Sequence, residues 1–503
     1  MTDYVRKILD ARVYDVAIET PLDKMVRMSQ RMNAVVLLKR EDLQPVFSFK
    51  IRGAYNKISR LSAAEQQAGV ICASAGNHAQ GVALSSQRLG VTATIVMPVT
   101  TPAIKVDAVR YWGGHVVLEG ETFDDAYVHA RLLEKQHGMT FVHPYDDSDV
   151  IAGQGTVGVE ILHQYPGVIE AIFVPIGGGG LAAGIASYVK FLRPDTKVIG
   201  VEPIDAASMK AAIANGARVI LDRVGLFADG VAVRQAGEET FRICRELLDD
   251  VITVDTDAIC AAVKDIFEDS RVLAEPAGAL SLAGMKAYIA ANPDRTGALV
   301  AINSGANMNF DRLRHIAERA EVGESREILL GVTIPEAPGS YRRFVQSLGD
   351  RTITEFNYRY ANGGRANVFV GLKLTDAKRE KDEVVSRLRA LGLDVIDMSA
   401  DETAKLHVRY MVGGRAADLA DEIVLRCEFP ERPGALLRFL DGVGSWNITL
   451  FHYRNHGADY GRVLVGMQVP EQDREQFYQR LISLGYHYEI ETDNDAYRLF
   501  LRD

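Results

Sequence analysis

The stretch "AIFVPIGGGGLAAG", residues 171–184, decides the fold class of the chain. An unbroken apolar run leads into four glycines, residues 177–180, and a helical sequence opens near Leu181. Unbroken apolar runs are typical of strands that are covered on both faces of a parallel sheet. Glycines let backbone N–H groups converge, and a helix N-terminus attracts anions, so the turn predicts a phosphate site. A tight strand-to-helix turn without a ligand would use the same residues.

The same strand-then-helix rhythm continues on both sides of this stretch. Short apolar runs at 34–39, 69–74, 92–98, 115–120, 197–203 and 297–303 alternate with helical sequences. This alternation predicts an α/β region with parallel sheets, because parallel strands need a long crossover between them and a helix usually supplies it. We therefore expect one large α/β domain over residues 1–320.

Length and composition indicate a soluble protein with more than one domain. A chain of 503 residues exceeds the ~250–300 residues at which a single core stops growing. Its net charge of −10 argues against nucleic acid or an anionic membrane surface as the main partner. No apolar segment approaches the ~18 residues of a membrane span, so no membrane partner is expected.

The cysteines and the first residues indicate a reducing compartment, which we expect to be the cytoplasm. Four cysteines, Cys72, Cys244, Cys260 and Cys427, are scattered and form no C-x-x-C pair, so neither a disulfide framework nor a zinc site is predicted. The opening sequence "MTDYVRKILDARVYDVAIETPL" carries acidic residues and lacks the apolar core of a signal peptide.

Beyond residue 318 the chain repeats itself. "TIPEAPGSYRRF" at 333–344 returns as "EFPERPGALLRF" at 428–439, and "EFNYRY" at 355–360 returns as "LFHYRN" at 450–455. Both pairs are 95 residues apart (428 against 333, and 450 against 355). Each copy reads strand, PE-x-PG turn, helix, strand, strand, helix, strand, so a duplicated module is predicted. We expect a charged linker at 321–328 and repeats at 329–415 and 422–503.

A lysine, Lys50, stands within the apolar stretch "VFSFKIRGAYNK", residues 46–57. The ordinary interpretation is a surface lysine whose stem lies over apolar neighbours. The functional alternative is a reactive amine, because desolvation lowers the pKa of a lysine and leaves more of it neutral and nucleophilic. The stretch by itself does not decide between the two.

Two further loops follow predicted strands. "CASAGNHAQG" (72–81) offers Ser74 and Asn77 beside a predicted helix start, where a helix cap would use the same residue types. "INSGANMNF" (302–310) places Ser304 at the tip of another such loop. Both loops are therefore candidate binding loops.

Taken together, these motifs resemble a known family. The motifs S-F-K-x-R-G-A and S-x-G-N-H-x-Q-G, the glycine loop and the late N-S-G loop, in this order, resemble the fold-type II pyridoxal-phosphate enzymes, the tryptophan-synthase β-like family. The resemblance covers nearly all of residues 5–318 and falls nearest the threonine/serine dehydratases. With the duplicated C-terminal module, the chain resembles the biosynthetic, isoleucine-regulated threonine deaminases, or threonine ammonia-lyases.

The resemblance implies a fold, a cofactor and an assembly. The implied fold is a catalytic domain of two α/β subdomains, followed by a C-terminal α+β regulatory domain of tandem ACT-like repeats. The implied cofactor is pyridoxal 5′-phosphate, and the implied assembly is a homotetramer.

The resemblance also implies roles for residues at matching positions. Lys50 would form the Schiff base with the cofactor and act as the general base. Asn77 would hydrogen-bond the phenolic oxygen, and Ser304 would face the pyridine nitrogen without keeping it protonated, which favours β-elimination over transamination. The phosphate would be held by backbone amides of Gly177, Gly178, Gly179, Gly180 and Leu181. The substrate carboxylate would be bound by the loop of Ser74, Ala75, Gly76 and His78.

The implied reaction converts L-threonine to 2-oxobutanoate and ammonia, the first committed step of isoleucine biosynthesis. In such enzymes isoleucine inhibits and valine relieves, through the C-terminal repeats. Aromatic and arginine side chains beside a glycine turn can close around a small amino acid, whereas Phe356 and Phe451 are expected in the core. The candidate effector residues are Tyr358, Arg359, Tyr453 and Arg454.

Two sequence differences from the related eukaryotic serine racemases narrow the predicted activity and the predicted metal content. In those racemases the second serine of the loop S-S-G-N-H is an acid–base group. Ala75 stands at that position here, so racemisation is not expected. Their Glu-x-x-x-Ala-x-Asp cation motif reads Glu202, Ala206 and Ser208 here, so no divalent metal site is expected, and a monovalent ion stays open. Glu275 in "AEPAGA" is expected either near the cofactor ring or in a structural role.

Three other functions stay open at this point. A serine-preferring dehydratase of the same family would share these motifs. A threonine synthase would need an additional anion site for its phosphorylated substrate, and none is evident in the sequence. A non-catalytic amino-acid sensor could keep the fold, although the retained Lys50, Asn77, Gly177–Gly180 loop and Ser304 argue against it.

Overall fold

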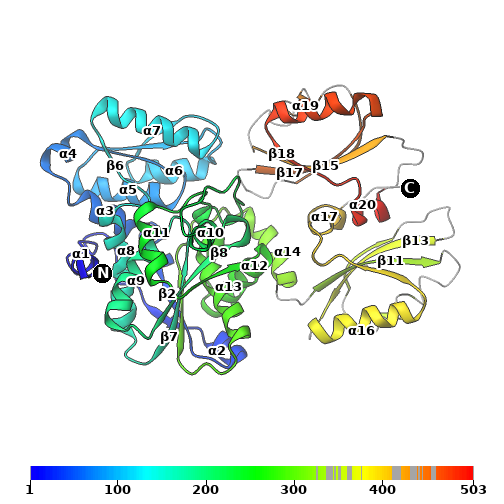
Figure 1. Ribbon diagram of the computed structural model, residues 1–503, viewed down its shortest axis with the longest axis horizontal. Coiled ribbons are helices and arrows are strands. Elements are labelled where there is room, and N and C mark those ends of the chain that lie inside the picture. Colours follow the sequence, from blue (N-terminus) through cyan, green and yellow to red (C-terminus); the bar gives the residue numbers. More distant parts are fainter. Residues whose placement is uncertain are drawn as a thin grey trace. The chain divides into compact units, whose positions relative to one another are not determined.

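The chain folds into two compact units, Met1–Ala320 and Glu321–Asp503 (Figure 1). The computed structural model describes residues 2–323, 327–335, 344, 347–348, 353–358, 365–374, 377–410, 421–430, 439, 442–443, 446–454 and 460–501. Within these residues, no helix combines the length and the apolar character that crossing a membrane requires.

The first unit contains a six-stranded sheet with the strand order β1-β2-β10-β7-β8-β9. Neighbouring strands are parallel, except that β1 pairs antiparallel with β2. The predicted strands are confirmed at β2, β7, β8 and β10. The prediction missed β1, which has only three residues, and β9, which is partly exposed at the sheet edge. The strands are β1 Leu22–Lys24, β2 Val36–Arg40, β7 Ile169–Pro175, β8 Lys197–Pro203, β9 Asp250–Val254 and β10 Ala298–Asn303.

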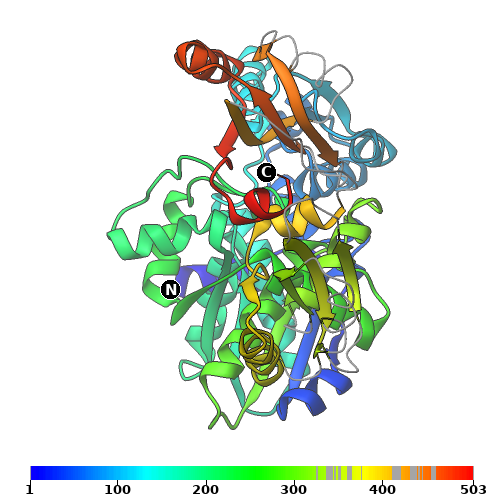
Figure 2. The ribbon, with the colours of Figure 1, turned by 90° about the vertical axis from the view of Figure 1, so that its right-hand side faces the viewer.

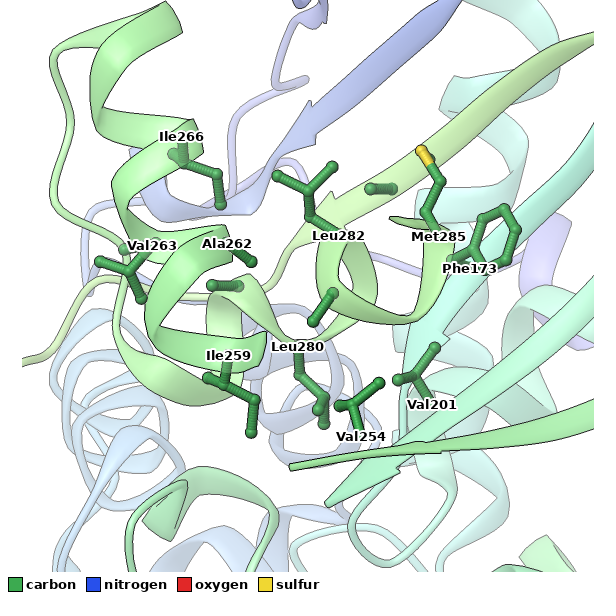
Figure 3. Packing of buried hydrophobic residues seen from close by; sticks show 14 of the residues in the cluster. Phe173, Val201, Val254, Ile259, Ala262, Val263, Ile266, Leu280, Leu282 and Met285 are labelled. Carbon is green, nitrogen blue, oxygen red and sulfur yellow. The ribbon is translucent and has the colours of Figure 1, made fainter. Parts of the chain in front are cut away.

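Helices cover both faces of this sheet, as its apolar strands require. One face carries α2 (Val26–Met32), α12 (Thr256–Ser270), α13 (Pro276–Ala291) and α14 (Arg312–Gly323). The other face carries α1 (Thr2–Leu9), α8 (Ser148–Gln164), α9 (Gly180–Leu192), α10 (Ser208–Asn215) and α11 (Glu238–Leu247). Figure 3 shows Leu280 of α13 between Ile259 of α12 and Val254 of β9, so α13 is enclosed by apolar neighbours.

A four-stranded parallel sheet forms the second subdomain of the first unit, in the order β5-β4-β3-β6. Its strands are β3 Val70–Ala73, β4 Ala93–Met97, β5 His115–Leu118 and β6 Thr140–Phe141, and α4 (Ala63–Ala68) precedes β3. One face packs against α3 (Lys50–Ile58), α5 (Asn77–Leu89) and α6 (Ala103–Tyr111), and the other against α7 (Phe123–His137). The expected pair of α/β subdomains is confirmed.

The second unit consists of two antiparallel sheets with equivalent strand orders, β12-β13-β11-β14 and β16-β17-β15-β18. Leu330 pairs with Val370 in the first sheet, and Leu425 pairs with Val465 in the second. The two registers therefore agree at the offset of 95 residues, and the predicted duplication is confirmed. The strands are β11 Glu327–Pro335, β12 Ile353–Tyr358, β13 Arg365–Lys373, β14 Asp394–Asp397, β15 Glu422–Pro430, β16 Asn447–Arg454, β17 Tyr460–Gln468 and β18 His487–Ile490.

Among the residues that the structure describes, each repeat carries a long helix on its sheet, α16 (Ala377–Ala390) in the first and α19 (Arg474–Leu484) in the second. Figure 2 shows the two repeats in different colours, yellow-olive for the first and orange-red for the second. Shorter helices, α17 (Glu402–Leu406) and α20 (Asp495–Phe500), follow the last strand of each sheet.

Two predictions for the second unit involve residues that the structure describes only in part. The predicted linker at 321–328 includes the last residues of α14 and the first of β11, which begins at Glu327. Tyr358 ends β12, and Tyr453 and Arg454 end β16, but their side chains lie outside the described residues, as does the whole of Arg359.

Candidate active site

Lys50 is the first residue of α3, and its side chain is half-buried. Its Nζ atom donates a hydrogen bond to the Pro144 carbonyl oxygen at 2.8 Å. Burial lowers the pKa of Lys50 to about 8, although the Glu275 carboxylate acts in the opposite direction. A partly neutral amine that points into the protein is the property that the functional interpretation of this lysine requires.

The residues that follow Lys50 hold its helix in place. The Arg52 guanidinium is fully buried, and its nitrogens lie 2.7 Å from a Glu41 oxygen and 2.5 Å from a Glu160 oxygen. Gly53 lets α3 approach α8, because a Cβ atom at this position would lie 2.8 Å from a backbone oxygen of α8. The R-G pair of the S-F-K-x-R-G-A motif therefore positions the helix that begins with Lys50.

The segment "VHPYDD", residues 142–147, connects the lysine with the predicted phosphate loop, and the sequence analysis did not identify it. Its Pro144 carbonyl accepts the hydrogen bond from Lys50, and its Tyr145 ring lies against Gly178. A Cβ atom at Gly178 would be 2.1 Å from that ring, so the contact requires glycine. The segment follows the two-residue strand β6 and has no hydrophobic period, so only its turn-forming residues could have marked it.

The four-glycine loop joins β7 to α9, as predicted. Gly179 has a φ of +96°, a conformation that residues with side chains rarely adopt. Because α9 begins at Gly180, its first N–H groups have no acceptor within the helix and can bind an anion. The Leu181 side chain is buried in the core, so this residue can offer the anion only its backbone N–H.

The N-terminus of α5 is formed by the loop that the sequence analysis singled out, with Ala75 and Gly76 before the first helical residue, Asn77. A Cβ atom at Gly76 would meet no atom within 4 Å, so open space lies beside this residue. The first N–H groups of the helix have no acceptor within the helix. The Gly76 N–H donates to Ser74 Oγ at 3.3 Å, which holds the loop in shape. The loop can therefore receive a second anion.

His78 contributes to this loop through its backbone rather than its ring. The ring is buried, and its Nε2 atom lies 2.8 Å from the Val142 carbonyl oxygen. Burial and the nearby charge of Lys50 lower the pKa of His78 to about 3, so the ring is neutral at physiological pH. Nε2 must carry the ring proton to donate to that carbonyl, which leaves Nδ1 an acceptor that cannot bind a carboxylate.

Ser304 follows β10 and is buried next to the lysine segment. Its Oγ atom donates to the Ala277 carbonyl oxygen at 3.2 Å. Its own carbonyl oxygen accepts a hydrogen bond from the Phe49 N–H at 3.2 Å, directly before Lys50. The late N-S-G loop and the lysine are thus brought together, as the prediction requires.

The Asn77 side chain does not cap α5. Its Nδ2 atom donates to Glu275 Oε1 at 2.6 Å, and its Oδ1 atom accepts from Asn307 Nδ2 at 2.7 Å. Burial, and then the charge of Asp229, raise the pKa of Glu275 to about 7. Glu275 therefore lies in the site, whereas Asn307 was missed because nothing in its local sequence distinguishes it from an ordinary loop asparagine.

These groups fit pyridoxal phosphate. The structure supplies a partly neutral primary amine for an aldehyde, a glycine loop at a helix N-terminus for a phosphate, an amide for a ring oxygen and a neutral hydroxyl for a ring nitrogen.

A metal site has no comparable support in the part of the chain that the structure describes, where no group of three His, Cys, Asp or Glu side chains is arranged to hold an ion. The Glu202 carboxylate accepts hydrogen bonds from the Met209 and Lys210 N–H groups, at 2.8 and 2.9 Å, and so satisfies the first turn of α10.

Comparison with known proteins defines the class. Residues 13–305 match the family described as pyridoxal-phosphate dependent enzyme, and the chain belongs to this family. Residues 318–408 and 413–501 each match the C-terminal regulatory domain of threonine dehydratase. The chain is thus a pyridoxal-phosphate dependent enzyme with a duplicated regulatory domain of the threonine dehydratase type.

Similar proteins extend over the full length. The biosynthetic L-threonine dehydratase of Burkholderia multivorans is 56% identical over 99% of both chains. That of Escherichia coli K12 is 55% identical over 99% of this chain and 97% of its own.

Solved structures resemble somewhat under two thirds of this chain. The processed form of threonine deaminase isoform 2 from Solanum lycopersicum is 51% identical, with a TM-score of 0.63 over 64% of this chain and 88% of its own. Maize serine racemase is 32% identical, with a TM-score of 0.59 over 62% of this chain and 95% of its own.

Proposed function

We propose that this enzyme converts L-threonine to 2-oxobutanoate and ammonia, as the first committed step of isoleucine biosynthesis. The observation that carries the proposal is the amine of Lys50, which has a pKa lowered to about 8 and donates to the Pro144 carbonyl oxygen. The next residue, Tyr145, lies against Gly178 of the glycine loop. Full-length identity of 55–56% to biosynthetic L-threonine dehydratases supports the choice of substrate.

Each group in the site would have its own role in the proposed reaction. Bound pyridoxal phosphate would supply an aldehyde for the substrate amino group and a ring that withdraws electrons from Cα. Lys50 Nζ, held by the Pro144 carbonyl, would take the Cα proton, because a pKa of about 8 leaves part of the amine neutral near physiological pH. The N–H groups at the start of α5 would bind and orient the substrate carboxylate.

The remaining residues would place the cofactor. The N–H groups of the glycine loop and Leu181 would hold the phosphate, and Asn77 would donate to the phenolic oxygen. Ser304, a neutral hydroxyl, would face the pyridine nitrogen without the charge of a carboxylate. This arrangement favours loss of the β-hydroxyl, and Ala75 leaves no hydroxyl at the position where racemases carry their second acid–base group.

The proposal includes regulation, assembly and location. Isoleucine would inhibit and valine would relieve through the C-terminal repeats, with Tyr358, Arg359, Tyr453 and Arg454 as effector contacts. The working domain limits are 1–320, 321–328, 329–415 and 422–503. A homotetramer in the cytoplasm is the proposed functional form.

Replacement of Lys50 tests the catalytic part of the proposal. Lys50→Ala removes both the amine that would attach the cofactor and the general base, so 2-oxobutanoate release from L-threonine should fall by at least about 10³-fold. Lys135→Ala, which removes an exposed lysine of α7, is the matched control and should keep normal release. Unchanged turnover of Lys50→Ala would contradict the assignment, and a higher kcat/KM for L-serine would favour the serine-preferring dehydratase.

A further inference from the structure

A chain of hydrogen bonds crosses the candidate site and joins four segments of the sequence. Asn307 Nδ2 donates to the Val46 carbonyl oxygen at 2.7 Å and to Asn77 Oδ1 at 2.7 Å. Asn77 Nδ2 in turn donates to Glu275 Oε1 at 2.6 Å. Val46 lies four residues before Lys50, so the chain starts at the backbone of the lysine segment.

The direction of these hydrogen bonds is set at the backbone end. A backbone carbonyl can only accept, so Asn307 must present its Nδ2 atom to Val46. The second N–H of the same nitrogen reaches Asn77, which must therefore turn Oδ1 toward Asn307. As a result Asn77 presents Nδ2 to the opposite side, where Glu275 accepts one of its two N–H groups. The other N–H has no partner among the described residues and is free for a ligand.

The acceptor at the other end of the chain is held in place by close packing. Glu275 is buried, with 4% of its surface exposed. A Cβ atom at Gly305 would lie 2.5 Å from Glu275 Oε1, and one at Gly230 would lie 3.5 Å from it. Because both positions are glycines, the carboxylate fits between two backbone segments and has little room to rotate.

We propose that Asn307 and Glu275 are positioning residues that hold the Asn77 amide with an N–H directed at the phenolic oxygen of pyridoxal phosphate. The inference rests on the proposed function and adds to it two residues that do not themselves touch the substrate. Without Asn307, the amide can turn over and present Oδ1 to the phenolic oxygen, and two acceptors do not form a hydrogen bond. The hydrogen-bonded chain removes that alternative.

Asn307→Asp tests the donor at the backbone end. The substitution keeps the shape of the side chain but replaces its donor nitrogen with an acceptor, so it should release or reverse Asn77. We expect the Kd of the cofactor-free protein for pyridoxal phosphate, measured by equilibrium dialysis, to rise at least about tenfold, and the absorbance maximum of the bound cofactor to shift. Asn309→Asp makes the same change two residues further on, outside this chain of hydrogen bonds, and should bind within about twofold of the native protein.

Glu275 provides an independent test at the other end. Glu275→Gln keeps an oxygen that can accept from Asn77, whereas Glu275→Ala removes it. We expect the alanine variant to bind pyridoxal phosphate at least about tenfold more weakly than the glutamine variant. If Asn307→Asp does not fold, judged by thermal unfolding of the cofactor-free protein, this pair decides.

Two results would overturn the inference: equal binding by the Asn307→Asp and Asn309→Asp proteins, or equal losses in both Glu275 variants. Normal uptake of pyridoxal phosphate by the native protein in either case would leave the proposed function standing. A native protein that takes up no pyridoxal phosphate would contradict both the inference and the proposed function.

Discussion

The amine of Lys50 lies inside the protein beside the Pro144 carbonyl oxygen, with the Glu275 carboxylate nearby. Burial penalises the ammonium form more than the neutral amine, and the carboxylate favours the ammonium. Burial is the larger of the two effects, which is why the pKa of Lys50 falls to about 8. The surroundings of one side chain therefore supply the neutral amine that both attachment of an aldehyde and proton abstraction require.

Competitive labelling with acetic anhydride can measure this pKa directly. In the cofactor-free protein we expect Lys50 to titrate with a midpoint of about pH 8, well below the value of about 10.4 for lysine in model peptides. Glu275→Gln removes the negative charge that favours the ammonium, so the midpoint for Lys50 should move lower still. A midpoint for Lys50 above about pH 10 would show that its amine is not desolvated.

At the scale of elements, α3 is held by an ion cluster that the sequence analysis did not anticipate. Arg52 lies two residues after the catalytic candidate and contacts Glu41, just beyond β2, and Glu160 on α8. Lys39 of β2 also contacts Glu160, at 2.6 Å. All four side chains are buried, so the cluster holds α3 between β2 and α8. It thereby fixes the position of Lys50, the first residue of α3.

Arg52→Ala should destabilise the protein strongly, because it leaves two buried carboxylates with less compensating charge. We expect the free energy of unfolding in urea to fall by about 3–5 kcal/mol. Arg12→Ala is the matched control, since Arg12 forms an exposed pair with Asp15 and its loss should cost at most about 1 kcal/mol. Equal effects of the two substitutions would show that the buried cluster contributes no more than a surface pair.

At the scale of the whole molecule, the chain combines one catalytic unit with two equivalent sheets. Leu330–Val370 and Leu425–Val465 are matching pairs in these sheets, and both outer strands shift register at equivalent positions. We propose that such duplication gives each chain two related binding surfaces. Regulation by two amino acids then needs only that each favours a different conformation of the same enzyme.

Effector titration tests this regulation. We expect isoleucine to weaken threonine turnover by about 5–150-fold, the usual range of allosteric coupling, and added valine to restore it. Tyr358→Ala and Tyr453→Ala should each reduce the isoleucine effect. Tyr111→Ala, which removes a tyrosine with 76% of its surface exposed in the first unit, should not. Turnover that is indifferent to isoleucine would retain the lyase and reject the regulatory proposal.

Much of this architecture could be predicted because its signals are local. The strands at β2, β7, β8 and β10 are unbroken apolar runs, and a run of that kind is readable within a few residues. The glycine loop is likewise recognised within one short segment. The 95-residue repeat is recognised by comparing short segments with each other. The short strand β1 and the edge strand β9 were missed because neither has a long apolar run.

The sequence by itself determined the fold class, the duplication, and the identity of Lys50, Asn77 and Ser304 as candidates. Only the tertiary structure decided how these groups are held. Asn77 meets Glu275 across 198 residues and Asn307 across 230, and no local pattern encodes such contacts. The lowered pKa of the lysine arises from its burial in the folded chain, and the orientation of the asparagine amide arises from Glu275 and Asn307. Both burial and hydrogen-bond direction depend on what the folded chain brings together.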